Sequence, residues 1–206
     1  MRILVTAGPT CEDIDPVRTL TNRSSGQMGY AVAAEAVRRG HDVVLVSGPT
    51  CLDPPLGTRL VPVRSAADML AACLAEFDAC DAAVLVSAVA DYRPAEFSPH
   101  KLKKSDDDLT LRLTRTEDIA KRLGAAKTRQ VLVGFALESG EGHANAERKL
   151  ETKHLDAIVL NHPDTFGAGS IEAELLVRDQ PWTPPERLSK PQLAARVLDL
   201  VEHHTQ

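Results

Sequence analysis

Apolar runs and helical patterns alternate along almost the whole of this 206-residue chain. Several of the apolar runs have apolar residues at successive positions, as expected for strands buried on both faces. We expect strands over 3–7, 43–47, 60–63, 82–88, 131–135 and 157–160. Capping signals and periodicity predict helices over 27–39, 65–77, 116–123, 144–154 and 189–203. This alternation predicts one α/β domain over 1–206, with a Rossmann-like, doubly wound, mostly parallel sheet flanked by helices.

Two further segments fit a small antiparallel element. Residues 109–113 and 174–177 alternate in polarity or are short, and they lie between polar residues, so we expect strands outside the parallel sheet. Residues 92–108 and 162–170 are expected to form long functional or mobile loops. The order of the strands does not follow from the sequence.

Composition and charge exclude several classes of function. A hydrophobic content of 43% favours a globular fold, and the net charge of −5 disfavours non-specific binding to nucleic acid. No apolar run approaches the roughly 18 residues that a membrane span needs, and no signal peptide is visible, so we expect a cytoplasmic protein without a membrane role. The four cysteines lack C-x-x-C spacing, so neither a disulfide framework nor a metal site is expected.

The polar loop over 15–29 follows the first predicted strand and leads into the first helix. Its Ser24, Ser25 and Gly26 stand where backbone N–H groups and the helix dipole favour an anion. Arg18 fits a bidentate bond to a carboxylate or phosphate, and Asn22 has donors and an acceptor for a polarised acyl group. The competing interpretation is an ordinary helix cap with solvated arginines. A dinucleotide site is not indicated, because no G-x-G-x-x-G follows the first strand and no carboxylate ends the second.

Other chemical groups follow later strands. Asp91 follows the fourth strand and suits a sugar, a base or Mg²⁺, or equally a turn that it caps itself. Residues 101–104, Lys-Leu-Lys-Lys, fit either a clamp for a triphosphate or a solvated charged face. Phe135 ends the fifth strand and offers an apolar ring to a base or ribose.

Lys149 and Lys153 are four residues apart and share one face of a predicted helix. From the residues alone, a surface helix with salt bridges explains them better than a ligand does. Asn161 ends the sixth strand and is expected to form a turn rather than to act in catalysis.

Together these segments resemble phosphopantothenoylcysteine synthetase, the ligase of coenzyme A biosynthesis that in many bacteria forms the C-terminal half of a bifunctional flavoprotein. The motifs that carry the resemblance include Ile14-Asp-Pro-Val-Arg18, Asn22-Arg-Ser-Ser-Gly26 and Lys101-Leu-Lys-Lys104. The matching segments run in family order over nearly the whole chain, at 6–10, 14–18, 22–26, 28–30, 46–49, 88–94, 101–104, 133–136, 149–150 and 153–161.

The resemblance implies a two-step ligation of 4′-phosphopantothenate to L-cysteine. CTP first activates the carboxylate as an acyl-cytidylate and releases pyrophosphate, and the cysteine amine then forms the amide and releases CMP. CTP is thus the co-substrate, and Mg²⁺ is the implied cofactor, held mainly by the nucleotide phosphates. No flavin is expected in this chain, because the flavin-dependent decarboxylase half has no counterpart here. The implied partners are a second copy, in a homodimer with shared sites, and such a decarboxylase domain in a full-length protein.

The resemblance also assigns roles to individual residues. Asn22 would contact the acyl intermediate, Arg18 would serve the second step, and Lys101 would steady the α-phosphate as the third catalytic residue. The turn at 24–26 would bind the phosphate of phosphopantothenate. The implied nucleotide-binding residues are Leu85, Val86, Ser87, Asp91, Lys101, Glu117, Asp118, Ile119, Ala120, Phe135, Lys149 and Lys153.

The sequence departs from the family pattern at a few positions. Cys11 stands where many relatives have a basic residue, so no binding role is carried over to it. Thr116-Glu117 replaces the usual Asn-Pro at a helix start, and Leu137 replaces a usual alanine. Two alternatives stay open on the same fold: an NAD(P)-dependent oxidoreductase, and a non-catalytic nucleotide-binding module. The choice of CTP over ATP rests on the resemblance alone.

Overall fold

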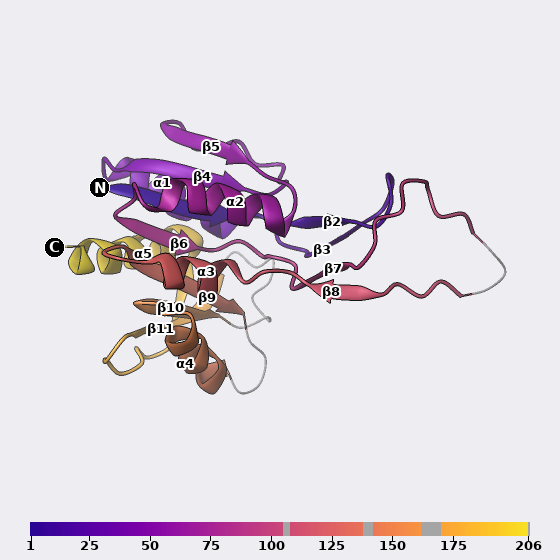
Figure 1. The fold of residues 1–206 in the computed structure, drawn as a ribbon. Coiled ribbons are helices and arrows are strands. Elements are labelled where there is room, and N and C mark those ends of the chain that lie inside the picture. The colour runs from indigo at the N-terminus through magenta and orange to yellow at the C-terminus, as the bar shows by residue number, and fades with distance from the viewer. Residues whose placement is uncertain (105–107, 138–141, 162–169, 206) are drawn as a thin grey trace.

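The structure is a computed structural model of the chain and describes residues 1–104, 108–137, 142–161 and 170–205. Its centre is an eight-stranded sheet with the order β12-β11-β10-β9-β6-β1-β4-β5 (Figure 1). Helices cover both faces of this sheet, and two small antiparallel ribbons extend beyond the ends of its strands. The predicted fold class, a mostly parallel α/β sheet with a small antiparallel element, is therefore confirmed.

The first four parallel strands occupy the centre and one edge of the sheet. β1 (Arg2–Ala7) lies between β4 (Asp42–Ser47) and β6 (Ala82–Leu85), parallel to both. β5 (Thr58–Pro62) pairs with β4 and closes that edge. Because β4 and β5 add to one side of β1 and β6 adds to the other, the strand order changes direction between β1 and β6.

The remaining strands complete the other half of the sheet. β9 (Val131–Leu137) and β10 (Ala157–Asn161) continue the parallel arrangement beyond β6. β11 (Ser170–Val177) then pairs antiparallel with β10, and β12 (Glu186–Ser189) pairs antiparallel with β11. The sheet is thus mixed, with its antiparallel strands confined to one edge, which is common in large α/β sheets.

The helices form two layers. α1 (Gln27–Arg38) and α5 (Lys190–His204) lie on one face of the sheet, and α2 (Ala66–Phe77), α3 (Ile119–Ala126) and α4 (Gly142–Thr152) lie on the other. Each layer therefore buries one apolar helical stripe against the sheet, as the doubly wound prediction requires.

Alternate residues of the central strand divide the core in two. Ile3 and Val5 of β1 are fully buried beneath α1 and α5, whereas Leu4 is fully buried on the side of α2, α3 and α4. Each such side chain stabilises the fold by about 1.5–3 kcal/mol relative to an exposed one. The continuous apolar run of β1 follows from this burial on both faces.

Helix caps fix two of the predicted helix starts. Ser65 and Ser189 each accept a hydrogen bond from the backbone N–H three residues later, at Asp68 and Gln192. The side chains of Asp68 and Gln192 in turn accept from the backbone N–H of the capping serines. The helix predicted from the Ser-Ala-Ala-Asp signal at 65–77 is therefore confirmed.

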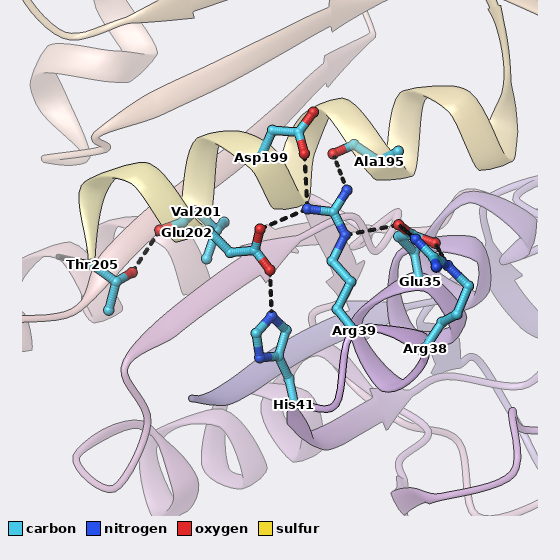
Figure 2. A network of polar contacts seen from close by, with 9 residues as sticks. All are labelled: Glu35, Arg38, Arg39, His41, Ala195, Asp199, Val201, Glu202 and Thr205. Atoms are coloured by element: carbon cyan, nitrogen blue, oxygen red, sulfur yellow. Dashed lines mark hydrogen bonds and ion pairs between the residues drawn. The ribbon is translucent and has the colours of Figure 1, made fainter.

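A network of charged side chains joins α1 to α5 (Figure 2). Arg39 lies at the C-cap of α1, and its guanidinium donates to Glu35 (2.8 Å) and, across the helix interface, to Asp199 (2.8 Å) and Glu202 (2.7 Å). His41 contacts the second oxygen of Glu202 at 2.8 Å. The contacts connect the beginning of the chain to its last helix.

The two small ribbons grow out of the loops after β1 and β6. β2 (Cys11–Asp13) pairs with β3 (Thr19–Thr21), and β7 (Tyr92–Pro94) pairs with β8 (Leu113–Arg115). These ribbons and their connecting segments project away from the sheet (Figure 1).

We call residues 11–21, 92–104 and 108–115 the arm. The arm carries most of the large apolar side chains that the described structure leaves exposed, namely Val17, Tyr92, Phe97, Leu109, Leu111 and Leu113. Such a concentration on one projection is typical of an interaction surface.

Three strand predictions require correction. The strand predicted over 109–113 is wrong, since the strand is β8 and shares only Leu113 with that range; the alternating leucines are exposed on the arm instead of facing a sheet. Residues 174–177 belong to the main sheet as part of β11, not to a separate element, because they pair with β10. The strand predicted over 82–88 ends at Leu85.

The other differences concern element ends and loops. The helix predicted over 116–123 begins at Ile119, because Asp118 and not Thr116 caps it. The loop predicted over 92–108 contains β7. Of the loop predicted over 162–170, only Ser170 is described, and it begins β11; residues 162–169 lie outside the described residues. In the described part of the chain, no helix has the length and apolar character that crossing a membrane requires.

Candidate active site

A cavity of about 1140 Å³ opens at the carboxyl ends of β1, β6 and β9. It lies where the strand order changes direction, which is the usual ligand position in open α/β sheets. The N-termini of α1 and α3 both open onto it, through residues 26–29 and 117–121. Two helix N-termini facing one cavity favour a ligand with more than one anionic group.

The first of these helix starts is built from small residues. Gly26 is the N-cap of α1, has a φ of +78°, and offers no side-chain cap to the first turn, which contains no acidic residue. Its N–H donates to the Ser24 hydroxyl at 3.3 Å. A Cβ on Gly29 would lie 2.6 Å from the Cβ of Ala7, so glycine is what lets α1 start directly against β1. The predicted anion turn therefore lines the cavity and has no side-chain cap on the first turn of α1, an arrangement that suits an anion.

The segment after β6 is held by hydroxyl and amide side chains. The buried Thr6 hydroxyl accepts from the N–H groups of Val86 (3.1 Å) and Ser87 (3.2 Å). A ligand that contacts the backbone of Val86 or Ser87 would therefore use their carbonyl oxygens. Asn22 donates its side-chain amide to the carbonyls of Ala88 (3.0 Å) and Val89 (3.1 Å), which leaves its side-chain carbonyl oxygen as the group available to a ligand.

The second helix start carries a charge pair at the surface of the cavity, with the side chain of Asp118 42% exposed and that of Lys153 24% exposed. Asp118 caps α3 by accepting from the Lys121 N–H at 3.0 Å, and it forms an ion pair with Lys153 at 2.9 Å. Burial alone would raise the pKa of Asp118, but the hydrogen bonds from Lys153 and from the Lys121 N–H lower it overall. Lys149 lines the same cavity, so two lysines lie near the N-terminus of α3. A Cβ on Gly124 would lie 1.9 Å from the Lys153 carbonyl oxygen, so α3 packs directly on the backbone of Lys153.

Apolar residues from both faces of the sheet line the cavity. Phe135 packs against the core on the α1–α5 side, whereas Leu155 and Ile158 belong to the core on the side of α2, α3 and α4. Gly134 allows Leu155 to approach β9 closely, since a Cβ there would lie 2.7 Å from the Leu155 Cδ1. Phe135 is partly buried and lines the cavity, as predicted, but β9 continues past it to Leu137, so the predicted strand end at Phe135 is wrong.

Two predicted catalytic residues, Arg18 and Lys101, do not line the cavity and lie on the arm. Arg18 forms an ion pair with the fully buried carboxylate of Asp15 at 2.6 Å, and its guanidinium also donates to the Leu102 carbonyl. The resemblance brings these residues to the reacting atoms, but the described single chain does not bring them to the cavity.

The cavity therefore brings together most of the predicted site and separates the rest. The predicted residues that line it are Asn22, Ser24, Ser25, Gly26, Leu85, Val86, Ser87, Asp91, Glu117, Asp118, Ile119, Ala120, Phe135, Lys149 and Lys153. Their shared location agrees with a common binding role, which stays a prediction.

Sequence reasoning missed several residues of the cavity. The cations Arg23, Arg115, Lys121 and Lys190 line it, and Lys190 comes from the first turn of α5 at the far end of the chain. Arg115 and Lys121 flank the predicted 117–120 segment, which was a usable signal, whereas nothing near Lys190 in the sequence indicated the cavity. Asn161, interpreted as a turn former, also lines it.

The described residues contain no group of three or more His, Cys, Asp or Glu side chains arranged to hold a metal ion. Asp91 is an exposed carboxylate on the cavity wall. This donor set fits a metal that arrives with a phosphate-bearing ligand better than a resident metal. All four cysteines are free thiols, and burial raises the pKa of Cys73 to about 12 and that of Cys80 to about 11.

Comparisons with known proteins agree with these observations. A family model described as the DNA/pantothenate metabolism flavoprotein C-terminal domain matches residues 1–204. The chain is 50% identical over 168 residues to the coenzyme A biosynthesis bifunctional protein CoaBC of Bacillus subtilis (strain 168), covering 81% of this chain and 41% of that protein. The chain thus spans less than half the length of this curated relative.

Solved structures show the same fold. The C-terminal domain of a coenzyme A biosynthesis bifunctional protein CoaBC superposes with a TM-score of 0.85 at 40% identity, covering 98% of this chain and 96% of that domain. A mutant of Cab2 in complex with phosphopantothenate-cysteine superposes with a TM-score of 0.79 at 15% identity, covering 98% of this chain and 87% of that one. At that identity the second likeness concerns the fold alone.

Proposed function

The chain belongs to the DNA/pantothenate metabolism flavoprotein C-terminal domain family, and from this membership we propose that it is a phosphopantothenate–cysteine ligase of coenzyme A biosynthesis. The observation that carries the proposal is the convergence of the uncapped N-terminus of α1, the N-terminal turn of α3, Lys149 and Lys153 on one cavity at the strand-order reversal. A nucleoside triphosphate and a phosphorylated acid together present several anionic groups, which such a cavity suits.

The proposed reaction has two steps. A carboxylate oxygen of 4′-phosphopantothenate bonds to the α-phosphorus of CTP while the bond to the bridging oxygen breaks, and pyrophosphate leaves. The amine of L-cysteine then bonds to the acyl carbon and loses a proton, while the bond from that carbon to the oxygen bridging it to phosphorus breaks, and CMP leaves with the bridging oxygen. Neither step needs covalent help from the protein, so catalysis rests on positioning and charge neutralisation.

The nucleotide is proposed to bind on the side of α3 and α4. Lys149, Lys153 and the N–H groups at the start of α3 would neutralise phosphate charge. Phe135 packs on the opposite, α1–α5 side of β9 and would contact the base or ribose from that side of the cavity. Carbonyl groups at 85–87 and the carboxylate of Asp91 would accept hydrogen bonds from base and sugar. Mg²⁺ would enter with the nucleotide phosphates.

The acyl substrate is proposed to bind on the side of α1. The N–H groups of the turn at 24–26 suit the terminal phosphate of phosphopantothenate. Asn22 precedes α1, and its side-chain amide donates to the carbonyls of Ala88 and Val89, which follow β6. It therefore lies between the proposed acyl-substrate side and the proposed nucleotide side of the cavity, where it would contact the activated carboxyl group.

The arm supports a homodimer as the working form. Arg18 and Lys101 lie on the arm beside exposed apolar side chains, such as Phe97 at 55% exposure. A second copy that covers this surface would let the arm complete a shared site, as the resemblance implies. The bifunctional relative also makes a flavin-dependent decarboxylase domain a proposed partner in a longer protein.

Pyrophosphate release tests the proposal. With 4′-phosphopantothenate, CTP and Mg²⁺ but no cysteine, the protein should release about one equivalent of pyrophosphate per site, and cysteine should then start turnover and CMP release. ATP in place of CTP tests the nucleotide preference. Pyrophosphate that requires cysteine even in the first turnover would contradict the acyl-cytidylate mechanism.

The same assay separates the alternatives. A non-catalytic module would bind CTP without any pyrophosphate release, and an oxidoreductase would bind NADPH more tightly than CTP in a direct titration.

A variant sharpens the assignment of Asn22. Asn22→Asp places a negative charge beside the anionic intermediate, so we expect turnover to fall by about tenfold or more, while CTP binding, measured by calorimetry, is retained. Unchanged turnover would remove Asn22 from the site.

A further inference from the structure

Asp15 is the most completely buried acidic group of the arm. Its side chain is 0% exposed, and its two oxygens have different partners. Oδ1 accepts from the N–H groups of Val17 and Arg18, both at 2.8 Å, which closes the turn between β2 and β3. Oδ2 accepts from the Arg18 guanidinium (2.9 Å from Nε and 2.6 Å from Nη2) and from the N–H of Leu102 at 3.0 Å.

Leu102 belongs to the lysine segment, which we define as residues 101–104. Its N–H is held by Asp15, and its carbonyl accepts from the Arg18 guanidinium. The N–H of Ser98 also donates to the Ile14 carbonyl at 3.1 Å, so three hydrogen bonds join the β2–β3 turn to the segment that follows β7. One buried carboxylate thus connects segments separated by 87 positions in the sequence.

We propose that Asp15 is a positioning residue that holds Arg18 and the lysine segment together as one catalytic unit of the arm. The proposal rests on the proposed function, because that function places Arg18 and Lys101 at the reacting atoms. Both residues lie outside the cavity, and both are tied to the same carboxylate, Arg18 directly and Lys101 through its neighbour Leu102. The unit would therefore reach the reacting groups as a whole.

The electrostatics of Asp15 agree with this arrangement. Burial alone would raise the pKa of the carboxyl group, but the N–H groups of Leu102, Val17 and Arg18 and the Arg18 guanidinium together hold it far below its ordinary range. The carboxylate of Asp15 is therefore ionised near neutral pH, and its hydrogen bond to the Leu102 N–H does not depend on pH in that range.

Asp15→Asn tests the proposal selectively. Asparagine keeps one acceptor oxygen, which can preserve the turn through Val17 and Arg18, but it turns an NH₂ group toward the Arg18 guanidinium and the Leu102 N–H. The variant should keep β2–β3 and release the lysine segment. Asp13→Asn is the matched control, since Asp13 lies on the same ribbon and pairs with Arg64 at 2.7 Å without touching Leu102.

Amide hydrogen exchange measures the hydrogen bond between the Leu102 N–H and Asp15 without relying on enzymatic activity. In Asp15→Asn the Leu102 amide should exchange about tenfold faster or more, the effect of losing a hydrogen bond to a charged acceptor, whereas Asp13→Asn should leave it unchanged. Arg18→Gln should give a smaller increase, because Asp15 still accepts from Leu102. Unchanged exchange at Leu102 in Asp15→Asn would overturn the proposal whether or not the chain is a ligase.

Kinetics then tests the catalytic consequence. Asp15→Asn should lower kcat by about tenfold or more, with the KM for CTP changed much less, because the cavity that we assign to the nucleotide contains neither residue. If Asp15 had a merely structural role, Asp15→Asn would lower the fraction of active protein. The ratio of pyrophosphate released in the first step to amide formed in the second would then stay as in wild type. Faster exchange at Leu102 with wild-type kcat would also overturn the proposal. A wild-type chain that releases no pyrophosphate would instead refute the proposed function and leave the exchange result standing.

Discussion

At the scale of single residues, the start of α1 depends on the backbone freedom of Gly26. Its φ of +78° lies in the left-handed region, and a Cβ there would stand 2.7 Å from the Thr50 Cγ2. Gly40 has a similar φ of +83°, but a Cβ on it would meet nothing within 4 Å. Substitution of Gly40 would therefore cost only the strain of the left-handed backbone, whereas substitution of Gly26 would add a steric clash to that strain.

Gly26→Ala should therefore be more damaging than Gly40→Ala. The left-handed conformation alone costs an alanine about 1 kcal/mol of stability, and this should be the whole effect at Gly40. At Gly26 the clash adds to it and distorts the turn, so we expect weaker binding of 4′-phosphopantothenate by about tenfold. Thermal unfolding and calorimetric titration of both variants measure this, and equal substrate affinity in the two would contradict the role of the turn.

The sequence predicted residues whose chemistry is local. The small residues before α1 indicated either an anion turn or an ordinary helix cap, because glycine and serine at a helix start suit both. Thr6 was not predicted, since its sequence context is that of an ordinary strand residue, and its two hydrogen bonds reach residues 80 and 81 positions away. Long-range partners of this kind leave no local pattern.

At the scale of secondary-structure elements, Arg39 joins α1 to α5. Its guanidinium contacts three carboxylates and the Ala195 carbonyl, and its side chain is only 15% exposed. Arg38, next to it, pairs only with Glu35 in the described structure and is 70% exposed. The neighbours form a natural comparison (Figure 2).

Arg39→Ala should destabilise the protein far more than Arg38→Ala. Loss of Arg39 leaves Asp199 and part of Glu202 without their cation and opens the α1–α5 interface, which we expect to cost about 2 kcal/mol. Loss of Arg38 removes one exposed pair, for which about 0.5 kcal/mol is typical. Urea unfolding of the two variants measures both values, and equal losses would show that the network does not hold α5.

The same network predicts a pH dependence. Hydrogen bonds from Arg38 chiefly, opposed by burial and assisted by Arg39, lower the pKa of Glu35 from its ordinary 4.5 to about 2. A lowered folded-state pKa stabilises the fold above the unfolded value, and the contribution is lost as the pH falls through the folded value.

We therefore expect Glu35→Gln to be less stable than wild type by about 1 kcal/mol near neutral pH, because screening keeps partly exposed pairs weak. The difference should shrink as the pH falls from 4.5 toward about 2. Chemical unfolding at a series of pH values measures it, and a difference that stays constant over this range would contradict the assignment.

Elements with strong local signals were predicted and short ones were not. Ser65 with Asp68, and Ser189 with Gln192, mark helix starts because each cap uses residues three apart. The three-residue strands β2 and β3 were missed, because they pair only with each other and are positioned by contacts such as that of Asp15 with Leu102. The long periodic segments therefore allowed the main sheet and its helices to be predicted. The short strands of the arm depend on tertiary contacts and were not predicted.

At the scale of the whole molecule, the sheet could be predicted as a class but not as an order of strands. Alternation of strands and helices indicates crossovers, and nothing in an apolar run specifies its neighbour. The segment 174–177 was assigned outside the main sheet because it is short and lies between polar residues, although β11 pairs with β10 within that sheet.

The arm makes the proposed homodimer testable. Phe97→Glu places a charge on the exposed apolar surface of the arm, so we expect the protein to shift from dimer to monomer. Leu56→Glu is the control, since Leu56 is 95% exposed on the loop before β5 and lies outside the arm. Size-exclusion chromatography with light scattering measures the mass of each, and a wild-type monomer would contradict the dimer.

The two ribbons of the arm are inserted after β1 and after β6, strands that pair in parallel although about 80 residues separate them. We expect the contact between Asp15 and Leu102 to form only after β1 and β6 have paired. Without that pairing, the single contact would have to offset the entropy cost of closing an 87-residue loop. We expect the arm to be the last part of the molecule to become ordered during folding and the first to open in the native state. If the cavity binds the nucleotide and the arm brings Arg18 and Lys101 to the reacting atoms, as proposed, a molecule with an open arm and an intact sheet would keep the cavity. Local unfolding of the arm alone would then stop turnover without releasing the nucleotide.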